Sequence, residues 1–215
     1  MVVRSRLLVA GSSVEPMPAI CEDWGVTRGS PPTVLLTRHG QTEWNLAGRR
    51  QGQLDSPLTE QGIRDAAQVA DAAKAYPVDI IVTSPLGRAR QTASIVNRVL
   101  GVGVVELSDL AEINHGSFAG FTDEELDNLH PGWRAERLGN LFDWCFPGGE
   151  SYRDGWLRAQ RALDSPPLKG ATCPLIVTHE MIGRMVIGLI DRLSPDQALA
   201  QSSPHGSIRV LHPRQ

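Results

Sequence analysis

Short apolar runs alternate with longer segments of mixed character along residues 33–212. The apolar runs are bounded by turn residues, which is typical of buried strands. The longer segments carry apolar residues at helical spacing with charged residues between them, which predicts amphipathic helices. We expect strands over residues 33–37, 78–83, 104–107, 174–178 and 207–212. We expect helices over residues 58–75, 85–100, 152–163 and 181–193, and one more that begins at Thr122.

Several helix boundaries carry their own signals. Pro85 suits the first turn of the helix over residues 85–100, and Gly101 is placed to close it. Thr122 and Glu125 form a capping box, which marks a helix start. The alternation of strands and helices predicts an α/β fold with three αβα layers, in which helices cover both faces of a mostly parallel sheet.

The first part of the chain differs from the rest. Residues 1–32 contain the stretches GSSVEPMP and RGSPP, which are rich in Gly, Ser and Pro, and they show no strong periodicity. We interpret them as a flexible N-terminal extension and residues 33–215 as one folded domain.

Composition excludes several classes of protein. The net charge of −3 and the pI of about 6.1 give no sign of a surface for nucleic acid or anionic membranes. No apolar run approaches the length of about 20 residues that a membrane span needs. Three widely spaced cysteines, Cys21, Cys145 and Cys173, indicate a reduced, cytoplasmic protein without a disulfide framework. The oligomeric state, monomer or homodimer, is left open.

Cationic or imidazole side chains follow three of the expected strands. The strand ends read LLTRHG, IVTSPLGR and LIVTHE, and they contribute Arg38, His39, Arg88 and His179. In parallel sheets, ligands bind beyond the carboxyl ends of the strands. An isolated histidine at such a place is more often structural, but four nitrogen-rich side chains that converge would repel each other without an anion. A phosphoryl group fits this arrangement, because arginine forks and helix N-termini bind its oxygens.

The same residues contain the parts needed for catalysis as well as binding. A neutral imidazole such as that of His39 can attack phosphorus and form a covalent intermediate. The leaving alkoxide then needs a proton, and Glu112, just after the third expected strand, is the candidate acid.

Several motifs together resemble the histidine phosphatase superfamily, in its phosphoglycerate mutase-like branch. The matching stretches are RHGQTEWN (38–45), RRQGQLDSPLTEQG (49–62), SPLGRARQTA (84–93), LAEINHGSFAG (110–120), PGGES (147–151) and VTHE (177–180). The resemblance implies that residues 33–215 are a catalytic domain that hydrolyses small phosphate monoesters without metal or cofactor. It implies His39 as the phosphorylated nucleophile and Glu112 as the proton donor. It also implies that Arg38, Arg88 and His179 bind the phosphoryl group and act in catalysis. Asn45 would help to orient the phosphate, and the backbone of Gln51 and Gly52 would line the entrance to the substrate site.

The chain departs from the family pattern at Glu180, where many relatives have glycine. We interpret Glu180 as a first-turn residue that the helix dipole favours and that points away from the site; the alternative is a substrate contact or a brake on anionic substrates. His115 could contact the substrate, but as a loop histidine we expect it to be solvated or structural. Trp133, Trp144 and Trp156 are expected to pack the region between the acid loop and the last parallel strand.

Three other functions are weighed against hydrolysis. A metal site built from His39, Glu112 and His179 is disfavoured by the fixed charge of Arg38. A non-catalytic module that binds a phospholigand would need neither a nucleophile nor an acid. A cofactor-dependent phosphoglycerate-type mutase is the runner-up. It is disfavoured because the lysine- and arginine-containing insertion of the mutases is replaced by a shorter stretch with Arg134 and Arg137. The leaving group is not identified by the sequence.

Overall fold

The computed structural model describes residues 33–213 of the chain. The predicted N-terminal extension, residues 1–32, lies outside the described residues. In the described part, five strands form one sheet in the order β3-β2-β4-β1-β5. The strands are β1 Val34–Arg38, β2 Ile80–Thr83, β3 Gly103–Glu106, β4 Pro174–Thr178 and β5 Arg209–Leu211. Strands β1 to β4 are parallel, and β5 pairs antiparallel with β1 at one edge.

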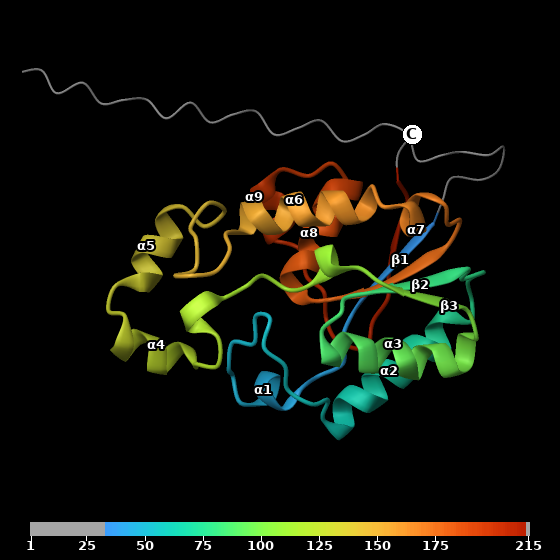
Figure 1. Ribbon diagram of the computed structural model, residues 1–215, viewed down its shortest axis with the longest axis horizontal. Helices are drawn as coiled ribbons and strands as arrows, with labels where there is room; N and C mark the ends of the chain where they lie inside the picture. The colour runs from blue at the N-terminus through green and yellow to red at the C-terminus, as the bar shows by residue number, and fades with distance from the viewer. Residues whose placement is uncertain (1–32, 214–215) are drawn as a thin grey trace, which may run out of the picture.

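Each face of the sheet is covered by its own pair of helices. Val34 and Leu36 of β1 are buried in the cluster that includes residues of α6 (Tyr152–Leu163) and α8 (Glu180–Ile190). Leu35, which points to the opposite face, is buried with residues of α2 (Glu60–Ala73) and α3 (Gly87–Leu100). Figure 1 shows α6 and α8 above the sheet and α2 and α3 below it. The predicted αβα fold is confirmed, and its two buried faces explain the apolar runs of the central strands β1, β2 and β4.

The helix boundaries follow local caps, with one instructive difference. The bounds of β4 and α6 agree with the sequence prediction. Helix α3 begins at Gly87, after the expected start at Pro85. The carboxylate of Asp55, from a distant loop, accepts the backbone N–H groups of Gly87 and Arg88 and so defines the first turn. The helix ends at Gly101, which has the left-handed φ of 64° that the expected glycine stop requires.

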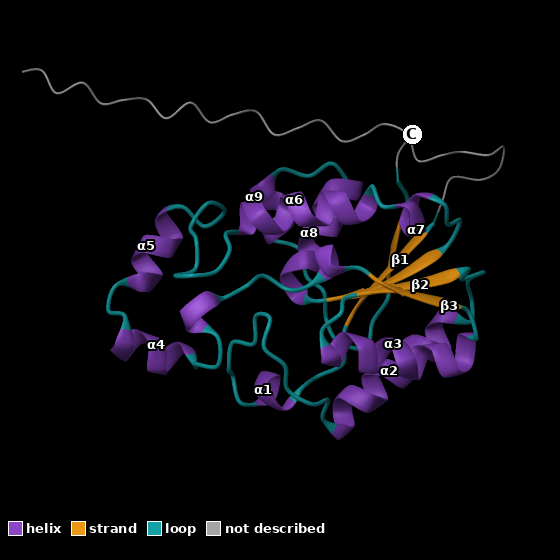
Figure 2. Cartoon of the chain, in the orientation of Figure 1, coloured by secondary structure: helices purple, strands orange, loops and turns teal. Residues whose placement is uncertain are grey.

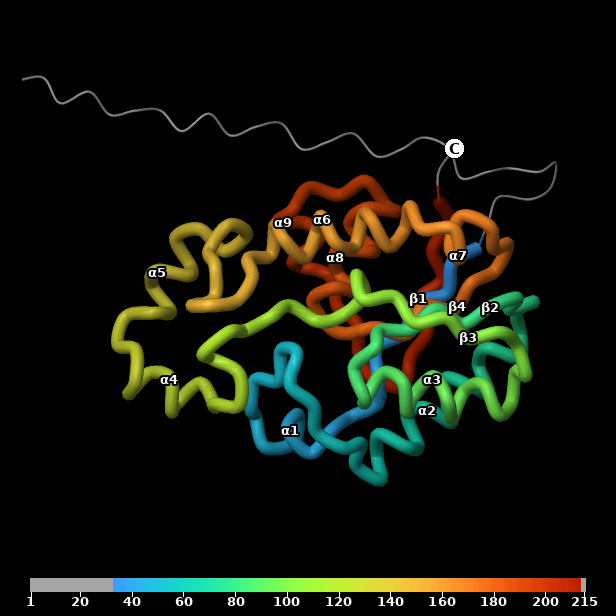
Figure 3. The backbone as a smooth tube through the Cα atoms, viewed as in Figure 1, coloured from blue at the N-terminus to red at the C-terminus, as the bar shows by residue number. Residues whose placement is uncertain are grey.

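A cap extends from the sheet between β3 and β4. It contains the 3₁₀ turns Ser108–Leu110 and Gly116–Phe118 and the helices α4 (Asp123–Leu129) and α5 (Trp133–Gly139). Figure 3 shows this segment leaving the sheet toward α4 and α5 and returning into α6. Trp133 and Trp144 pack around Phe118, and Trp156 packs against Phe142, so the predicted structural role of these tryptophans is confirmed.

Three short helices complete the described part of the chain: α1 Glu43–Leu46, α7 Pro166–Lys169 and α9 Pro195–Leu199. Figure 2 shows helices above and below the strands, and β3 and β5 form the two edges of the sheet. None of the helices in residues 33–213 is long and apolar enough to cross a membrane.

Candidate active site

Three strand ends bring the predicted phosphate-binding side chains to one edge of the sheet. β1 ends at Arg38 and runs into His39, β4 runs into His179, and Arg88 lies in the first turn of α3 after β2. The parallel register pairs Arg38 with Thr178, which places the two following histidines side by side. Their ring centroids are 5.2 Å apart, and Nε of Arg88 lies 3.2 Å from Nε2 of His39. The convergence expected from the sequence therefore exists in the structure.

The hydrogen bonds of His39 determine its tautomer. Nδ1 lies 2.8 Å from the carbonyl oxygen of Gly40, which can only accept, so Nδ1 carries the ring proton. Nε2 therefore has a lone pair, and it receives the Nε–H of Arg88. The ring is 3% exposed, and this burial, together with the charges of Arg88 and Arg38, keeps the pKa of His39 well below 6.5. His39 is neutral and presents a nucleophilic nitrogen to the site.

Arg88 is held by acceptors that surround its guanidinium. NH1 donates to the carbonyl of Leu54 and to Asp55, both at 2.8 Å, and NH2 donates to the carbonyl of Gly52 at 2.8 Å. The side chain is almost fully buried, and burial lowers the pKa of Arg88 from its usual range. A lysine could not satisfy these acceptors in one plane, so the fork geometry of arginine matters here. The arrangement fixes Nε of Arg88 toward His39.

His179 has one ring nitrogen bound by the protein and one without a protein partner. Nε2 lies 2.7 Å from Oγ of Ser84, and that oxygen accepts the backbone N–H of Leu86. The Ser84 hydroxyl can therefore donate its proton to Nε2, which leaves a proton on Nδ1 of His179 for an acceptor in the site. Nδ1 is buried and has no hydrogen-bond partner among the described residues. Burial and the charge of Arg88 hold the pKa of His179 well below 6.5.

The guanidinium of Arg38 forms an ion pair with the carboxylate of Glu180. NH1 of Arg38 lies 2.5 Å from Oε2 of Glu180, and Nε of Arg38 is buried without a partner among the described residues. The interpretation that Glu180 points away from the site is therefore wrong. The dipole of α8 does favour a carboxylate in the first turn, but it does not decide on which side of the helix the carboxylate lies. The cation of Arg38 attracts it inward.

Glu112 reaches the first turn of α8 from the loop after β3. Its carboxylate accepts the backbone N–H of Met181 at 3.2 Å and that of Ile113 at 2.9 Å, with a longer contact to Ile182 at 3.4 Å. The side chain is 7% exposed. Burial lowers the pKa values of Arg38 and Arg88, and the negative charge of Glu112 opposes this shift in both, so Glu112 lies within electrostatic reach of the convergent group. Glu112 thus belongs to the same site.

The loop that carries Glu112 is braced by Arg158 of α6. Arg158 donates to the carbonyl oxygens of Ala111 at 2.7 Å and Glu112 at 3.2 Å. Glu150 of the PGGES turn binds Arg158 through both carboxylate oxygens at 2.8 Å and also accepts the N–H of Asn114. The motif around Glu150 therefore positions the acid loop, a role that the sequence alone did not show.

The glycine of the RHG motif is required by a close approach of two backbones. A Cβ atom at Gly40 would lie 2.1 Å from the carbonyl oxygen of Gly62, in the first turn of α2. A Cβ atom at Gly62 would lie 2.0 Å from the carbonyl oxygen of Gln41. The backbone after His39 is thereby pressed against α2, and neither glycine has a positive φ.

The other residues predicted at the phosphate site make hydrogen bonds within the protein. Oδ1 of Asn45 accepts the N–H of Thr42 in the capping box of α1, and Nε2 of Gln51 donates to Oγ1 of Thr42. Oε1 of Gln51 is buried without a partner in the described residues. Gly52 has a φ of 53°, which favours glycine, and its carbonyl binds Arg88. These residues hold the rim of the site.

His205 is a neighbour of His39 that the sequence analysis missed. Its Nδ1 donates to the carbonyl oxygen of His39 at 2.5 Å, and the two ring centroids are 5.4 Å apart. It lies in the loop before β5, which strand-end reasoning does not address because β5 is antiparallel. The only sequence signal was a histidine beside Gly206, whose φ of 70° marks a turn.

His115 packs inside the cap. Its ring stacks on Phe146 with centroids 4.4 Å apart, and burial, with the charges of Arg50 and Arg137, lowers the pKa of His115 to about 3. Of the two roles expected for it, the structural one fits these contacts.

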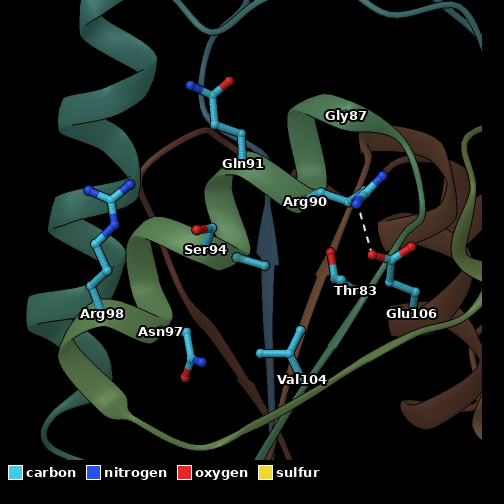
Figure 4. A pocket seen from close by; sticks show the side chains of 10 residues that line it. Thr83, Gly87, Arg90, Gln91, Ser94, Asn97, Arg98, Val104 and Glu106 are labelled. Carbon is cyan, nitrogen blue, oxygen red and sulfur yellow. Dashed lines mark ion pairs between the residues drawn. The ribbon is translucent and has the colours of Figure 1, made fainter.

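An open groove of about 640 Å³ lies between α3 and β3. Nε of Arg90 and Oε1 of Glu106, which both line the groove, are 3.0 Å apart. Figure 4 shows this ion pair as a dashed line. None of the four convergent side chains lines this groove. Within the described residues, no group of three or more His, Cys, Asp or Glu side chains could hold a metal ion.

The fold is α/β, and its site brings histidine and arginine side chains together beyond the carboxyl ends of the parallel strands. The sequence matches the histidine phosphatase superfamily (branch 1) over residues 34–215. The chain belongs to this family and is a histidine phosphatase, so the family, fold and enzyme class predicted from the sequence are confirmed.

Individual relatives are similar over most of the chain. The probable phosphoglycerate mutase GpmB of Cronobacter sakazakii is 40% identical over 152 residues, which cover 69% of each chain. The structure of YhfR from Bacillus stearothermophilus has a TM-score of 0.74 and 30% identity, covering 83% of this chain and 89% of that one. The mycobacterial glucosyl-3-phosphoglycerate phosphatase Rv2419c, in complex with VO3, has a TM-score of 0.71 and 25% identity, covering 86% of this chain and 100% of that one.

Proposed function

We propose that the domain over residues 33–215 hydrolyses small-molecule phosphate monoesters through a phosphohistidine at His39. The observation that carries this proposal is the state of His39: Nδ1 donates to the Gly40 carbonyl, and the Nε2 lone pair faces Arg88. A pKa well below 6.5 keeps this nitrogen unprotonated at neutral pH. A module that only binds phosphate would have no use for an unprotonated nitrogen at this position.

In the first step, Nε2 of His39 attacks phosphorus. The P–N bond forms while the bond between phosphorus and the leaving oxygen breaks, and Glu112 donates a proton to that oxygen. The phosphoryl oxygens carry negative charge in the transition state. They are bound by Arg38, Arg88 and the Nδ1–H of His179, which has no partner among the described residues. Asn45 and the backbone at Gln51 and Gly52 line the entrance.

In the second step, water attacks the phosphohistidine. Glu112 now accepts a proton from that water, the P–N bond breaks, and its electron pair returns to Nε2 of His39. Inorganic phosphate leaves, and the histidine is again neutral with its proton on Nδ1. The cycle is balanced without any redox partner.

The proposed reaction uses no metal ion. Arg38 and Arg88 supply the positive charge that a divalent cation supplies in metallohydrolases. Their guanidinium groups next to His39 would also raise the free energy of a bound divalent cation.

The proposed substrate is a small, soluble phosphate monoester. We place the protein in the cytoplasm because its widely spaced cysteines are typical of a reduced protein. A phosphoglycerate-type mutase is the second candidate, since GpmB is named a probable phosphoglycerate mutase. Hydrolysis is favoured because the cap helices α4 and α5 are short and because Arg134 is occupied by Asp127 in an ion pair of 2.7 Å. We infer no nucleic acid partner, and a homodimer is compatible with the proposal.

The proposal is tested by phosphate release from a panel of sugar, glycerate and nucleotide monophosphates, with and without EDTA. We expect release from at least one alkyl phosphate, unchanged by EDTA and lost in His39→Ala. With 3-phosphoglycerate primed by 2,3-bisphosphoglycerate, release should exceed formation of 2-phosphoglycerate. Efficient isomerisation would support the mutase instead, and activity lost in EDTA and restored by Mg²⁺ would support a metallohydrolase.

A further inference from the structure

Glu180 bridges two arginines at the edge of the phosphate site. Its Oε2 pairs with NH1 of Arg38, and its Oε1 accepts from Nε of Arg184 at 2.9 Å and from NH2 at 2.6 Å. Arg184, one turn later on α8, is anchored in turn to the carbonyl of Leu199 at 2.5 Å. The Glu180 carboxylate is 22% exposed, so water screens it only in part.

The cation of Arg38 needs a counter-ion before any substrate arrives. Its side chain is 18% exposed, and burial lowers the pKa of Arg38, while the charge of Glu180 is the largest influence that raises it. The carboxylate therefore occupies a donor of Arg38 that a phosphoryl oxygen would also use. A bound phosphoryl dianion must share Arg38 with Glu180 or displace it.

Arg184 makes that displacement feasible. Two donors of Arg184 hold Oε1 of Glu180, so the carboxylate keeps a partner when Arg38 turns toward phosphate. The carboxylate nevertheless stays near the site, since its helix is fixed by packing. Its negative charge continues to oppose a second anion there.

The leaving-group side of the site is close to the same carboxylate. The backbone N–H of Met181, the residue after Glu180, donates to Glu112, so the proposed proton donor and Glu180 meet at the first turn of α8. A leaving group that itself carries a negative charge would approach the carboxylate of Glu180.

We propose that Glu180 is a specificity-determining residue: an internal anion that weakens the binding of phosphate by Arg38 and disfavours substrates whose leaving group is negatively charged. The proposal rests on the proposed function and concerns which phosphate monoesters that site accepts. The same charge is expected to favour release of inorganic phosphate, because that product is itself a dianion.

The test is the affinity for inorganic phosphate, measured by calorimetry at low ionic strength, where screening is weak. Glu180→Gln and Glu180→Ala should each bind phosphate about 10- to 100-fold more tightly than the wild-type protein, the effect of one charge at about 6 Å in a partly screened site. Glu60→Gln is the matched control, since Glu60 is the first residue of α2 and fully solvated; it should leave the affinity unchanged. Unchanged or weaker binding in both Glu180 variants would overturn the proposal.

A substrate pair provides the second measurement. The ratio of kcat/KM for 3-phosphoglycerate to that for glycerol 3-phosphate should rise about tenfold in Glu180→Gln, because only the former carries a carboxylate. An unchanged ratio contradicts the proposal. Failure of the two proposals is distinguishable: a protein that hydrolyses phosphate esters, but whose Glu180 variants bind phosphate no more tightly, retains its function and loses this inference. If the protein does not hydrolyse phosphate esters but its Glu180 variants bind phosphate more tightly, the proposed function fails and the effect of Glu180 on phosphate binding holds.

Discussion

Arg88 donates its Nε–H to Nε2 of His39 across 3.2 Å, so the nitrogen proposed to attack phosphorus is aligned by the cation proposed to bind the phosphoryl group. This contact exists because Gly52, Leu54 and Asp55 bind three of the other four N–H donors of Arg88 and so fix the orientation of its guanidinium. When a phosphoryl group enters between them, Nε of Arg88 can transfer its hydrogen bond to a phosphoryl oxygen. The nucleophile and its electrostatic support are therefore organised before the substrate binds.

Replacing Glu112 by Gln should affect substrates unequally. Alkoxides leave poorly without a proton, whereas p-nitrophenolate leaves well, and Gln keeps the shape of Glu112 but cannot donate a carboxylic proton. We expect the single-turnover burst rate on an alkyl phosphate to fall by about 10²- to 10⁴-fold, with a much smaller fall on p-nitrophenyl phosphate. Equal losses on the two substrates would make Glu112 a structural residue.

Replacing His205 should lower kcat without a matching change in KM. His205→Ala removes the hydrogen bond to the carbonyl of His39 and loosens the loop that carries the nucleophile, for an expected loss of about tenfold in kcat. His205→Asn places a side-chain N–H where Nδ1 was and should recover most of the rate. If His205→Asn is as impaired as His205→Ala, or if KM alone changes, the hydrogen bond does not position His39.

Gly40→Ala should destabilise the protein and remove activity. The added Cβ would meet the backbone oxygen of Gly62, which cannot move without shifting α2. We expect the free energy of unfolding in urea to fall by about 3 kcal/mol. Gly139→Ala is the control, because a Cβ at Gly139 meets no atom within 4 Å, and this variant should be at least as stable as the wild type. Equal curves for all three proteins would contradict the close backbone approach.

Stability should decrease as pH falls below about 6.5. The pKa values of His39 and His179 lie well below 6.5 in the folded state and that of His115 is about 3, so the unfolded chain binds more protons than the folded one in this range. Each of these histidines should lower the free energy of unfolding by up to about 1.4 kcal/mol per pH unit, with no effect above the unfolded pKa.

Urea unfolding at about pH 7.5, 6.5 and 5.5 measures this slope. His115→Gln removes one of the four imidazoles whose pKa is lowered in the folded state, the others being His39, His179 and His205, so its slope should be smaller by about a quarter. A free energy of unfolding that stays constant over this pH range would mean that the histidines are accessible to protons in the folded state.

The sequence predicted the elements whose signal is local. β4 is a continuous apolar run, and α6 is capped by Ser151 and runs from Tyr152 to Leu163, so periodicity and caps suffice. The convergence of His39, Arg88 and His179 was also predictable, because parallel strands end at one edge. Helix α9 carries a readable signal that the analysis missed, the capping box of Ser194 and Gln197.

Other features depend on contacts between distant segments. Asp55 defines the start of α3, Arg158 braces the acid loop, and His205 supports the backbone of His39. No local pattern indicates these pairs, because each joins a loop to an element elsewhere in the chain. The inward orientation of Glu180 belongs to the same class, since only the folded site brings Arg38 opposite the first turn of α8.

The most direct test is to locate the covalent phosphate. Glu112→Gln mixed with p-nitrophenyl phosphate should form the intermediate and hydrolyse it slowly, since water has lost its base. After quenching in alkali, which preserves phosphohistidine, mass spectrometry of the peptides should find the phosphate on His39. The double variant with His39→Ala should carry none. Phosphate on another residue, or a normal yield of phosphoenzyme without His39, would contradict the account.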